Sequence, residues 1–124
     1  MRLSFIAGPN VEGLPISEAV QAGDFLFVSG MVGFGPQGDI VDGGVGAETD
    51  QIMKDLKDVL SRAGTDMGRI VKVNVYLVSP DDFETFNAAY ARYFPVNKPA
   101  RIGVVAGMTI PARVEMDFTV YLGD

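Results

Sequence analysis

Residues 113–122 alternate strictly between apolar and polar side chains, and this pattern limits the folds open to the chain. One side of the segment is apolar and consists of Val114, Met116, Phe118, Val120 and Leu122. The other side consists of Glu115, Asp117, Thr119 and Tyr121. A period of two residues predicts a β-strand with one buried face. Residues 70–78 alternate in the same way, and further strands are predicted over 25–31 and 101–106.

Two segments have the helical period instead. From Ala47 onward one apolar stripe is formed by Ile52, Met53, Leu56, Val59, Leu60 and Ala63. Gly64 suits the position after this helix, because glycine adopts the left-handed conformation that ends helices. A second helix is predicted to begin at Ser79, which can cap it, with Pro80 in its first turn. The stripe of this helix is aromatic and consists of Phe83, Phe86, Tyr90, Tyr93 and Phe94.

With a short strand near Leu3–Ile6, the predicted order of elements is β-β-α-β-α-β-β. Apart from this short strand, residues 1–23 are predicted to be irregular because of their glycine and proline breaks, with a turn at 21–24. This order favours an α+β fold in which two helices pack on one face of a mixed β-sheet. With 124 residues and no linker-like change in composition, the chain is predicted to form a single domain over 1–124.

The predicted strand over 25–31, Phe-Leu-Phe-Val-Ser-Gly-Met, is apolar on both faces. Two helices on one side of the sheet leave the other face of this strand uncovered. The simplest cover is another copy of the chain, so the sequence predicts a homo-oligomer.

The chain has no histidine, cysteine or tryptophan, and this absence excludes several chemistries. A histidine general base, a Ser-His-Asp triad, a thiolate nucleophile and a disulfide are all impossible. Any reaction must therefore use carboxylates, arginine, lysine, tyrosine, serine, backbone groups or water.

The 16 acidic and 10 basic residues give a net charge of −6 without a basic cluster. Because such a chain repels phosphate backbones, nucleic-acid binding is disfavoured. The longest apolar runs, such as Phe25–Val28, are too short to span a membrane, and the first residues lack the apolar stretch of a signal peptide. We therefore expect a soluble, cytoplasmic protein with neither nucleic acid nor membrane as a partner.

Arg101 and Gly103 are the first candidate site residues. A guanidinium at the start of an apolar strand can hold a carboxylate through two parallel hydrogen bonds. A glycine inside a strand often marks a close approach of a ligand or of another backbone. The alternatives are a surface arginine and a bulge at the glycine.

Glu115 is the second candidate. Together with Asp117 it forms a pair of carboxylates on one strand face, which can perform acid–base chemistry or position a water molecule. The alternatives are a solvated face and a cation site, and two carboxylates alone are a weak metal signal. Asn87 is expected on the inner side of the second helix, where a buried amide needs partners, and a structural role is favoured for it.

Ser29 and Gly30 interrupt an apolar strand. Without histidine or a neighbouring lysine, Ser29 has no base to activate it as a nucleophile. Gly30 can expose backbone groups to a ligand. The glycine-rich segment 33–46 lacks the Gly-Lys-Ser/Thr ending of a phosphate-binding loop.

Taken together, these segments resemble one family over residues 15–122. The matching blocks are Phe27-Val28-Ser29-Gly30, Asp50 through Leu60 with Ala63-Gly64, Ile70 through Leu77, Phe83 through Tyr90, Pro99-Ala100-Arg101 and Val114-Glu115-Met116-Asp117. In order, spacing and residue type they resemble the YjgF (Rid) family of reactive-intermediate, or enamine/imine, deaminases.

The resemblance implies a chorismate-mutase-like fold and a homotrimer with a central barrel and clefts between subunits. It further implies that Arg101 grips a substrate carboxylate, that Glu115 positions or activates water, and that Asn87 supports the cleft. Ser29, Gly30, Gly103 and Ile16 match positions that line the cleft. Relatives often carry a tyrosine where this chain has Ile16 and a cysteine where it has Gly103.

The expected function is hydrolysis of 2-imino or enamine acids to 2-oxo acids and ammonia, with no cofactor and no metal. A small carboxylate-bearing molecule is the expected substrate. A non-catalytic carboxylate-binding module of the same family is the alternative. Ribonuclease activity or translation inhibition is a third function, and the net negative charge disfavours it.

Overall fold

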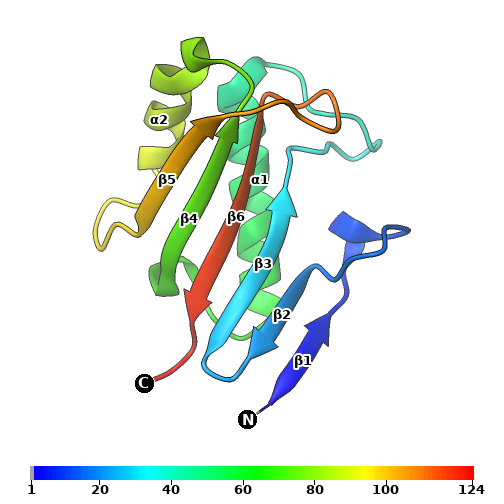
Figure 1. Ribbon diagram of the computed structural model, residues 1–124, viewed down its shortest axis with the longest axis vertical. Coiled ribbons are helices and arrows are strands. Elements are labelled where there is room, and N and C mark those ends of the chain that lie inside the picture. The colour runs from blue at the N-terminus through cyan, green and yellow to red at the C-terminus, as the bar shows by residue number, and fades with distance from the viewer. Residues whose placement is uncertain (1) are drawn as a thin grey trace.

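The computed structural model describes residues 2–124, which form one six-stranded sheet and two α-helices (Figure 1). In chain order the elements are β1 (Leu3–Ile6), β2 (Ala19–Ala22), β3 (Phe25–Met31), α1 (Gly44–Arg62), β4 (Ile70–Leu77), α2 (Phe83–Ala91), β5 (Ala100–Val105) and β6 (Val114–Tyr121). The strands lie in the order β1-β2-β3-β6-β4-β5. Of the strand pairs among residues 2–124, only β4 and β5 pair in parallel, so the sheet is mixed.

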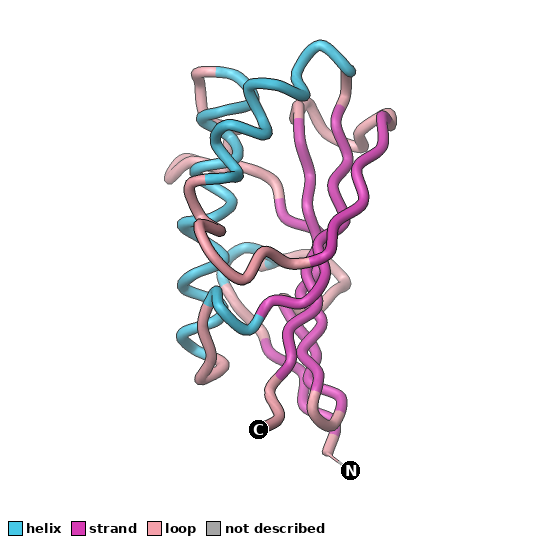
Figure 2. The backbone as a smooth tube through the Cα atoms, turned by 90° about the vertical axis from the view of Figure 1, so that its left-hand side faces the viewer, coloured by secondary structure: helices cyan, strands magenta, loops and turns pink. Residues whose placement is uncertain are grey.

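Both helices cover the same face of the sheet (Figure 2), as the sequence predicts. The apolar stripe of α1 is buried and packs on the inward-facing side chains of the central strands, among them Leu26, Val73, Val75, Met116 and Phe118. In β6 the burial alternates residue by residue, so its polar positions lie on the face without helices. We refer to this second face as the open face.

Several apolar side chains remain on the open face. Phe25 and Phe27 of β3 are 41% and 48% exposed, and Ile102 and Val104 of β5 are 54% and 44% exposed. Phe27 lies directly beside Thr119 of β6. Val104 lies one strand farther away, since Val104 and Glu115 both pair with Tyr76 of β4. As predicted, β3 is apolar on both faces while the helices cover only one face of the sheet, so apolar side chains remain exposed on the other.

Two expectations about strands are wrong. Residues Ala19–Ala22 form β2 instead of irregular chain, because they pair with β1 on one side and with β3 on the other. A short turn at Gly23 and Asp24 joins β2 to β3. The turn itself is correctly placed, and Gly23 has a positive φ of 59°. Val71 is exposed although its alternating pattern predicts burial, because the register of β4 with β6 shifts between Ile70 and Lys72.

Glu48 connects the first helix to the beginning of β6. Its side chain is buried, and its Oε1 atom accepts a hydrogen bond from the backbone amide of Arg113 at 2.8 Å. Burial raises the pKa of Glu48, although the backbone amides of Arg113 and Val114 oppose that effect. The carboxyl therefore fixes the strand end that carries Glu115.

We expect the Glu48→Gln variant to remove part of the pH dependence of stability. Because the pKa of Glu48 is higher in the folded chain, the unfolded chain releases this proton first as pH rises. The free energy of unfolding should therefore decline between the unfolded and the folded pKa, and glutamine should flatten that decline. Urea unfolding of both proteins across acidic to neutral pH measures the slope, and equal slopes would contradict the assignment.

Candidate functional site

Glu115 lies in a pocket of about 320 Å³ at the end of the sheet where β3 ends and β6 begins. One wall comes from the segment between β1 and β2, which contributes Val11, Leu14 and Ile16. The remaining walls of the pocket consist of Ser29, Gly30, Met31, Val32, Phe34, Thr109 and Ile110. Most of these side chains are apolar, so the pocket surrounds the carboxyl group with a poorly hydrated environment.

The Glu115 carboxyl group is half-buried beside Gly30. A side chain at position 30 would collide with the Oε2 atom of Glu115, so glycine allows the carboxyl group to lie against β3. The register of β3 with β6 shifts between Val28 and Met31, which opens the backbone at this point. Burial, and secondly the charge of Asp117, raises the pKa of Glu115. A carboxylate with raised proton affinity is a stronger general base.

Ser29 orients the neighbouring segment of the pocket. Its hydroxyl donates a hydrogen bond to the backbone carbonyl of Ser17 at 2.6 Å, next to Ile16. Its backbone amide donates to the carbonyl of Glu18 at 3.0 Å. Ser29 thus positions the wall that contains Ile16, and its hydroxyl is already engaged within the chain.

Glu18 and Asn10 belong to this region although the sequence alone does not single them out. The buried Oε1 atom of Glu18 accepts hydrogen bonds from Asn10 at 2.6 Å and from Arg62 at 2.7 Å. Arg62 also donates to the carbonyl of Ala7 at 3.2 Å. These contacts fasten the segment between β1 and β2 to the end of α1.

Arg101 lies in a second pocket, of about 370 Å³, between β5 and the beginning of α2. Its guanidinium carbon is 4.7 Å from the ring centre of Tyr90, 5.6 Å from that of Phe86 and 5.9 Å from that of Phe83. Aromatic faces attract a guanidinium group and fix its position. Among residues 2–124 no carboxylate forms an ion pair with Arg101, so its charge is available to an anionic ligand.

Gly103 lines the Arg101 pocket, and the bulge suggested as an alternative is absent. The register of β4 with β5 runs without interruption from Lys72 and Ala100 to Leu77 and Val105. A side chain at position 103 would make only an ordinary contact with Val75, at 3.9 Å. Packing within the chain does not demand a glycine here, and the space above Gly103 belongs to the pocket.

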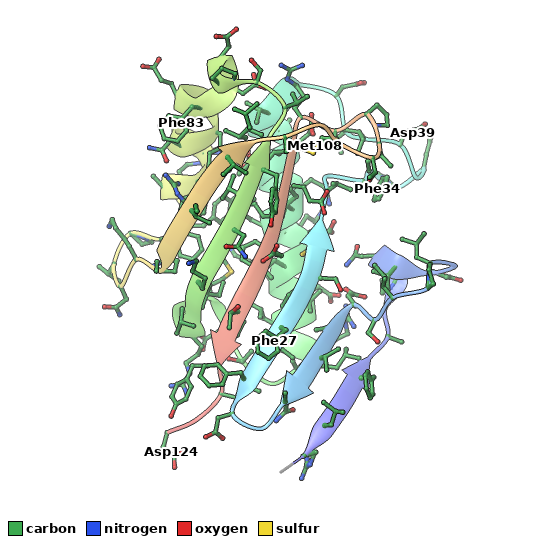
Figure 3. The ribbon with its side chains drawn as sticks, in the orientation of Figure 1. Phe27, Phe34, Asp39, Phe83, Met108 and Asp124 are labelled. Carbon is green, nitrogen blue, oxygen red and sulfur yellow. The ribbon has the colours of Figure 1, made fainter. Side chains whose placement is uncertain are left out.

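The two pockets lie on opposite faces of the sheet. Arg101 pairs with Val73, whose side chain is buried under the helices, whereas Glu115 pairs with Tyr76 on the open face. In Figure 3, Phe83 of the Arg101 pocket lies on α2, whereas Phe34 of the Glu115 pocket lies on the other side of the view, near the loop that holds Met108. One copy of the chain does not bring the two candidate groups together.

Asn87 is not on the inner side of α2. Its side chain is exposed, since the buried face of this helix consists of Phe86, Ala89 and Tyr90. Within residues 2–124 it makes no side-chain hydrogen bond and does not line the Arg101 pocket. The expectation of a buried amide is wrong because α2 begins at Phe83, which is itself 46% exposed.

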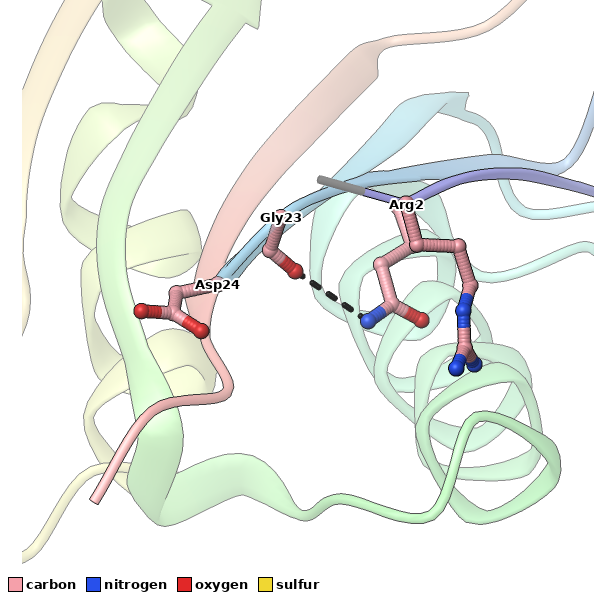
Figure 4. Close-up of a pocket in the computed structure, with 4 residues that line it drawn as sticks. Arg2, Gly23 and Asp24 are labelled. Carbon is pink, nitrogen blue, oxygen red and sulfur yellow. Dashed lines mark hydrogen bonds between the residues drawn. The ribbon is translucent and has the colours of Figure 1, made fainter.

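A further hollow at the opposite end of the sheet contains none of the predicted site residues. It is lined by Arg2, Gln21, Gly23 and Asp24, and Gln21 donates a hydrogen bond to the carbonyl of Gly23 (Figure 4). Over the described range 2–124, no cluster of three or more carboxylates is arranged to hold a metal ion. No helix in the same range has the length and apolar character needed to cross a membrane.

The fold and the two pockets define a small α+β domain with an arginine that has no carboxylate partner among residues 2–124 and a carboxyl group of raised pKa. Residues 12–122 match the family described as Endoribonuclease L-PSP. The chain therefore belongs to this family, which is the YjgF/Rid family.

Relatives and solved structures agree with this assignment. A RutC family protein of Pyrococcus horikoshii is 37% identical over 109 residues, which cover 86% of each chain. A protein of Mus musculus named 2-iminobutanoate/2-iminopropanoate deaminase is 40% identical over 105 residues, covering 83% of this chain and 78% of the relative. The crystal structure of a Rid family protein from Yersinia pestis is similar with a TM-score of 0.89 and 29% identity, covering 97% of this chain and 99% of the other.

Proposed function

We propose that the protein hydrolyses 2-imino acids, in equilibrium with their enamine forms, to 2-oxo acids and ammonia. The observation that carries this proposal is the presence in one chain of Arg101, which has no counter-ion among residues 2–124, and of Glu115, a carboxyl group of raised pKa. The name of the mouse relative supports the same reaction. Hydrolysis by these two groups, acting on one substrate, requires neither a metal nor a cofactor.

In the proposed reaction, Arg101 holds the substrate carboxylate through two parallel hydrogen bonds. The Glu115 carboxylate accepts a proton from water, whose oxygen attacks the carbon of the C=N bond. This proton passes to the substrate nitrogen, and a carbinolamine forms. Glu115 then transfers the hydroxyl proton to the nitrogen, the C–N bond breaks, ammonia leaves and the C=O bond forms. The carboxylate returns to its starting state.

We further propose that the reaction takes place in a cleft between subunits of a homotrimer. Because Arg101 and Glu115 lie on opposite sheet faces, a substrate can contact both only if they come from different copies. The apolar side chains on the open face, including Phe27 and Ile102, favour its burial by neighbouring copies. Ile16, Ser29 and Gly30 would then line the cleft beside Glu115, and Gly103 would line it beside Arg101.

The Glu115→Gln variant should lose at least about 100-fold of the rate, which is the usual contribution of a positioned general base. The assay generates 2-iminobutanoate in solution and follows the formation of 2-oxobutanoate and ammonia over the buffer background. The matched control is Asp24→Asn, which also removes one negative charge but lies at the far end of the sheet. Equal rates for the wild type and buffer would refute the function for this substrate.

Two other outcomes are informative. Binding of 2-oxobutanoate that is lost in Arg101→Ala, without any turnover of the imine, would favour a non-catalytic carboxylate-binding module. Cleavage of RNA that survives purification and is lost in Glu115→Gln would favour the activity in the family's description.

A further inference from the structure

A polar cluster lies next to Glu115 on the open face. Asp117 Oδ1 accepts a hydrogen bond from the side-chain amide of Asn74 at 2.8 Å, and Asp117 Oδ2 accepts one from the hydroxyl of Tyr76 at 3.4 Å. All three side chains are half-buried. Both oxygens of the carboxylate are thus held, so the negative charge of Asp117 has a fixed position.

The register of the sheet places this charge beside Glu115. Asn74 pairs with Asp117, and Tyr76 pairs with Glu115. Glu115 and Asp117 are two residues apart on one strand, so their α-carbons are about 7 Å apart on the same face. At this separation, in a partly dehydrated setting, two carboxylates repel each other appreciably.

We propose that Asp117 is a positioning residue that acts through Glu115, because its anchored negative charge makes Glu115 bind a proton more strongly and act as a stronger base. This inference rests on the proposed function, in which Glu115 takes a proton from water. In this proposal, the hydrogen bonds from Asn74 and Tyr76 hold the Asp117 carboxylate in place.

The surroundings of Glu115 support this assignment. Burial is the main cause of its raised pKa, and Asp117 is the second. From β4, the ionisable neighbour is Tyr76, whose own pKa is raised by the charge of Asp117, so that it remains a protonated hydrogen-bond donor. Lys72 lies farther along β4, beside Thr119.

The remaining elements around Glu115 contribute one further charge. The segment between β1 and β2 adds Glu18, whose carboxylate is bound by Arg62. The part of β3 that lines the pocket, Ser29 to Met31, has no ionisable side chain. Thr109 and Ile110, which line it from the loop between β5 and β6, have none either. Asp117 is therefore the nearby carboxylate without an arginine or lysine partner among residues 2–124.

The direct test is a carboxyl-carbon NMR titration of Glu115, whose resonance is identified by its absence in Glu115→Gln. In Asp117→Asn the midpoint should move to lower pH, because the repelling charge is gone while the oxygen that accepts from Asn74 remains. Asp117→Glu keeps the charge and should leave the midpoint close to the wild type. Asp24→Asn, which removes an exposed charge at the other end of the sheet, should leave it unchanged.

A purely structural role for Asp117 predicts a different pattern. It would lower stability in Asp117→Asn without moving the Glu115 midpoint, and this result would overturn the proposal. Asp117→Ser is a second neutral variant, with the same expected shift, should the asparagine variant fail to fold.

The pH profile of kcat/KM supplies the second measurement. In Asp117→Asn the acidic limb should move to lower pH, and the plateau should fall about threefold because a weaker base transfers protons more slowly. If the NMR midpoint shifts but the wild type hydrolyses no imine, the coupling stands and the proposed function fails. If the midpoint does not shift, the coupling fails whatever the activity.

Discussion

An equimolar mixture of Arg101→Ala and Glu115→Gln chains, unfolded and refolded together, should recover about one quarter of the wild-type activity. Each variant alone should be nearly inactive. In the proposed site, Arg101 comes from one chain and Glu115 from its neighbour. In the mixture such a site is intact only where the first chain is the Glu115→Gln variant, which keeps Arg101, and the second is the Arg101→Ala variant, which keeps Glu115. Random assortment of two chain types gives that combination at about one site in four.

The loss in Arg101→Ala alone should be large. Truncating one member of a buried, hydrogen-bonded charge pair costs about 2–5 kcal/mol, so kcat/KM should fall by about 30-fold or more. Arg92→Ala is the matched control, since Arg92 is an exposed arginine that pairs with Asp50 on the protein surface. If the co-refolded mixture stays as inactive as its components, although mixed oligomers form, the site lies within one chain and the proposed cleft is wrong.

The Arg62→Ala variant should lower the free energy of unfolding by about 2–3 kcal/mol, because it leaves the Glu18 carboxylate buried with Asn10 alone. The side chain of Glu18 is 2% exposed and that of Arg62 is 33% exposed, so the pair is enclosed mainly on the carboxylate side. Hydrogen exchange in the segment between β1 and β2 should accelerate as well, since Arg62 also binds the carbonyl of Ala7. Urea unfolding measures the first effect.

The control for this prediction is again Arg92→Ala, where an exposed pair should contribute less than about 1 kcal/mol. The double variant Arg62→Met with Glu18→Gln removes both charges and should recover much of the stability that Arg62→Ala loses. Equal destabilisation by Arg62→Ala and Arg92→Ala would show that the Glu18 contact does not fasten this segment.

Most of the fold could be predicted because its elements have strong local patterns. The alternation in β6 and the apolar stripe of α1 each specify one buried face without help from the rest of the chain. The strand β2 could not be found in this way. Its four residues have no pattern of their own and become a strand through pairing with β1 and β3. The shift that exposes Val71 likewise depends on its partner strand.

Two of the candidate residues, Arg101 and Glu115, could be singled out from the sequence, but their arrangement could not. Strand position and residue type are enough to select Arg101 and Glu115. Their placement on opposite faces follows only once β5 is known to pair with β4 in parallel. The aromatic rings around Arg101 are visible in the sequence as a helical stripe, yet nothing local indicates that Phe83 and Tyr90 enclose a guanidinium group. Glu18 was missed because its partner, Arg62, is 44 residues away.

If Arg101 and Glu115 act together in the proposed cleft between copies, their placement on opposite sheet faces makes activity depend on protein concentration. A reaction centre shared between copies exists only while the copies are associated, so catalytic output depends on the amount of chain present as well as on substrate. Dilution below the dissociation constant of the proposed assembly would therefore abolish the activity, although the chain itself would be unchanged. Near that dissociation constant, the proposed hydrolysis would increase more steeply than the amount of protein.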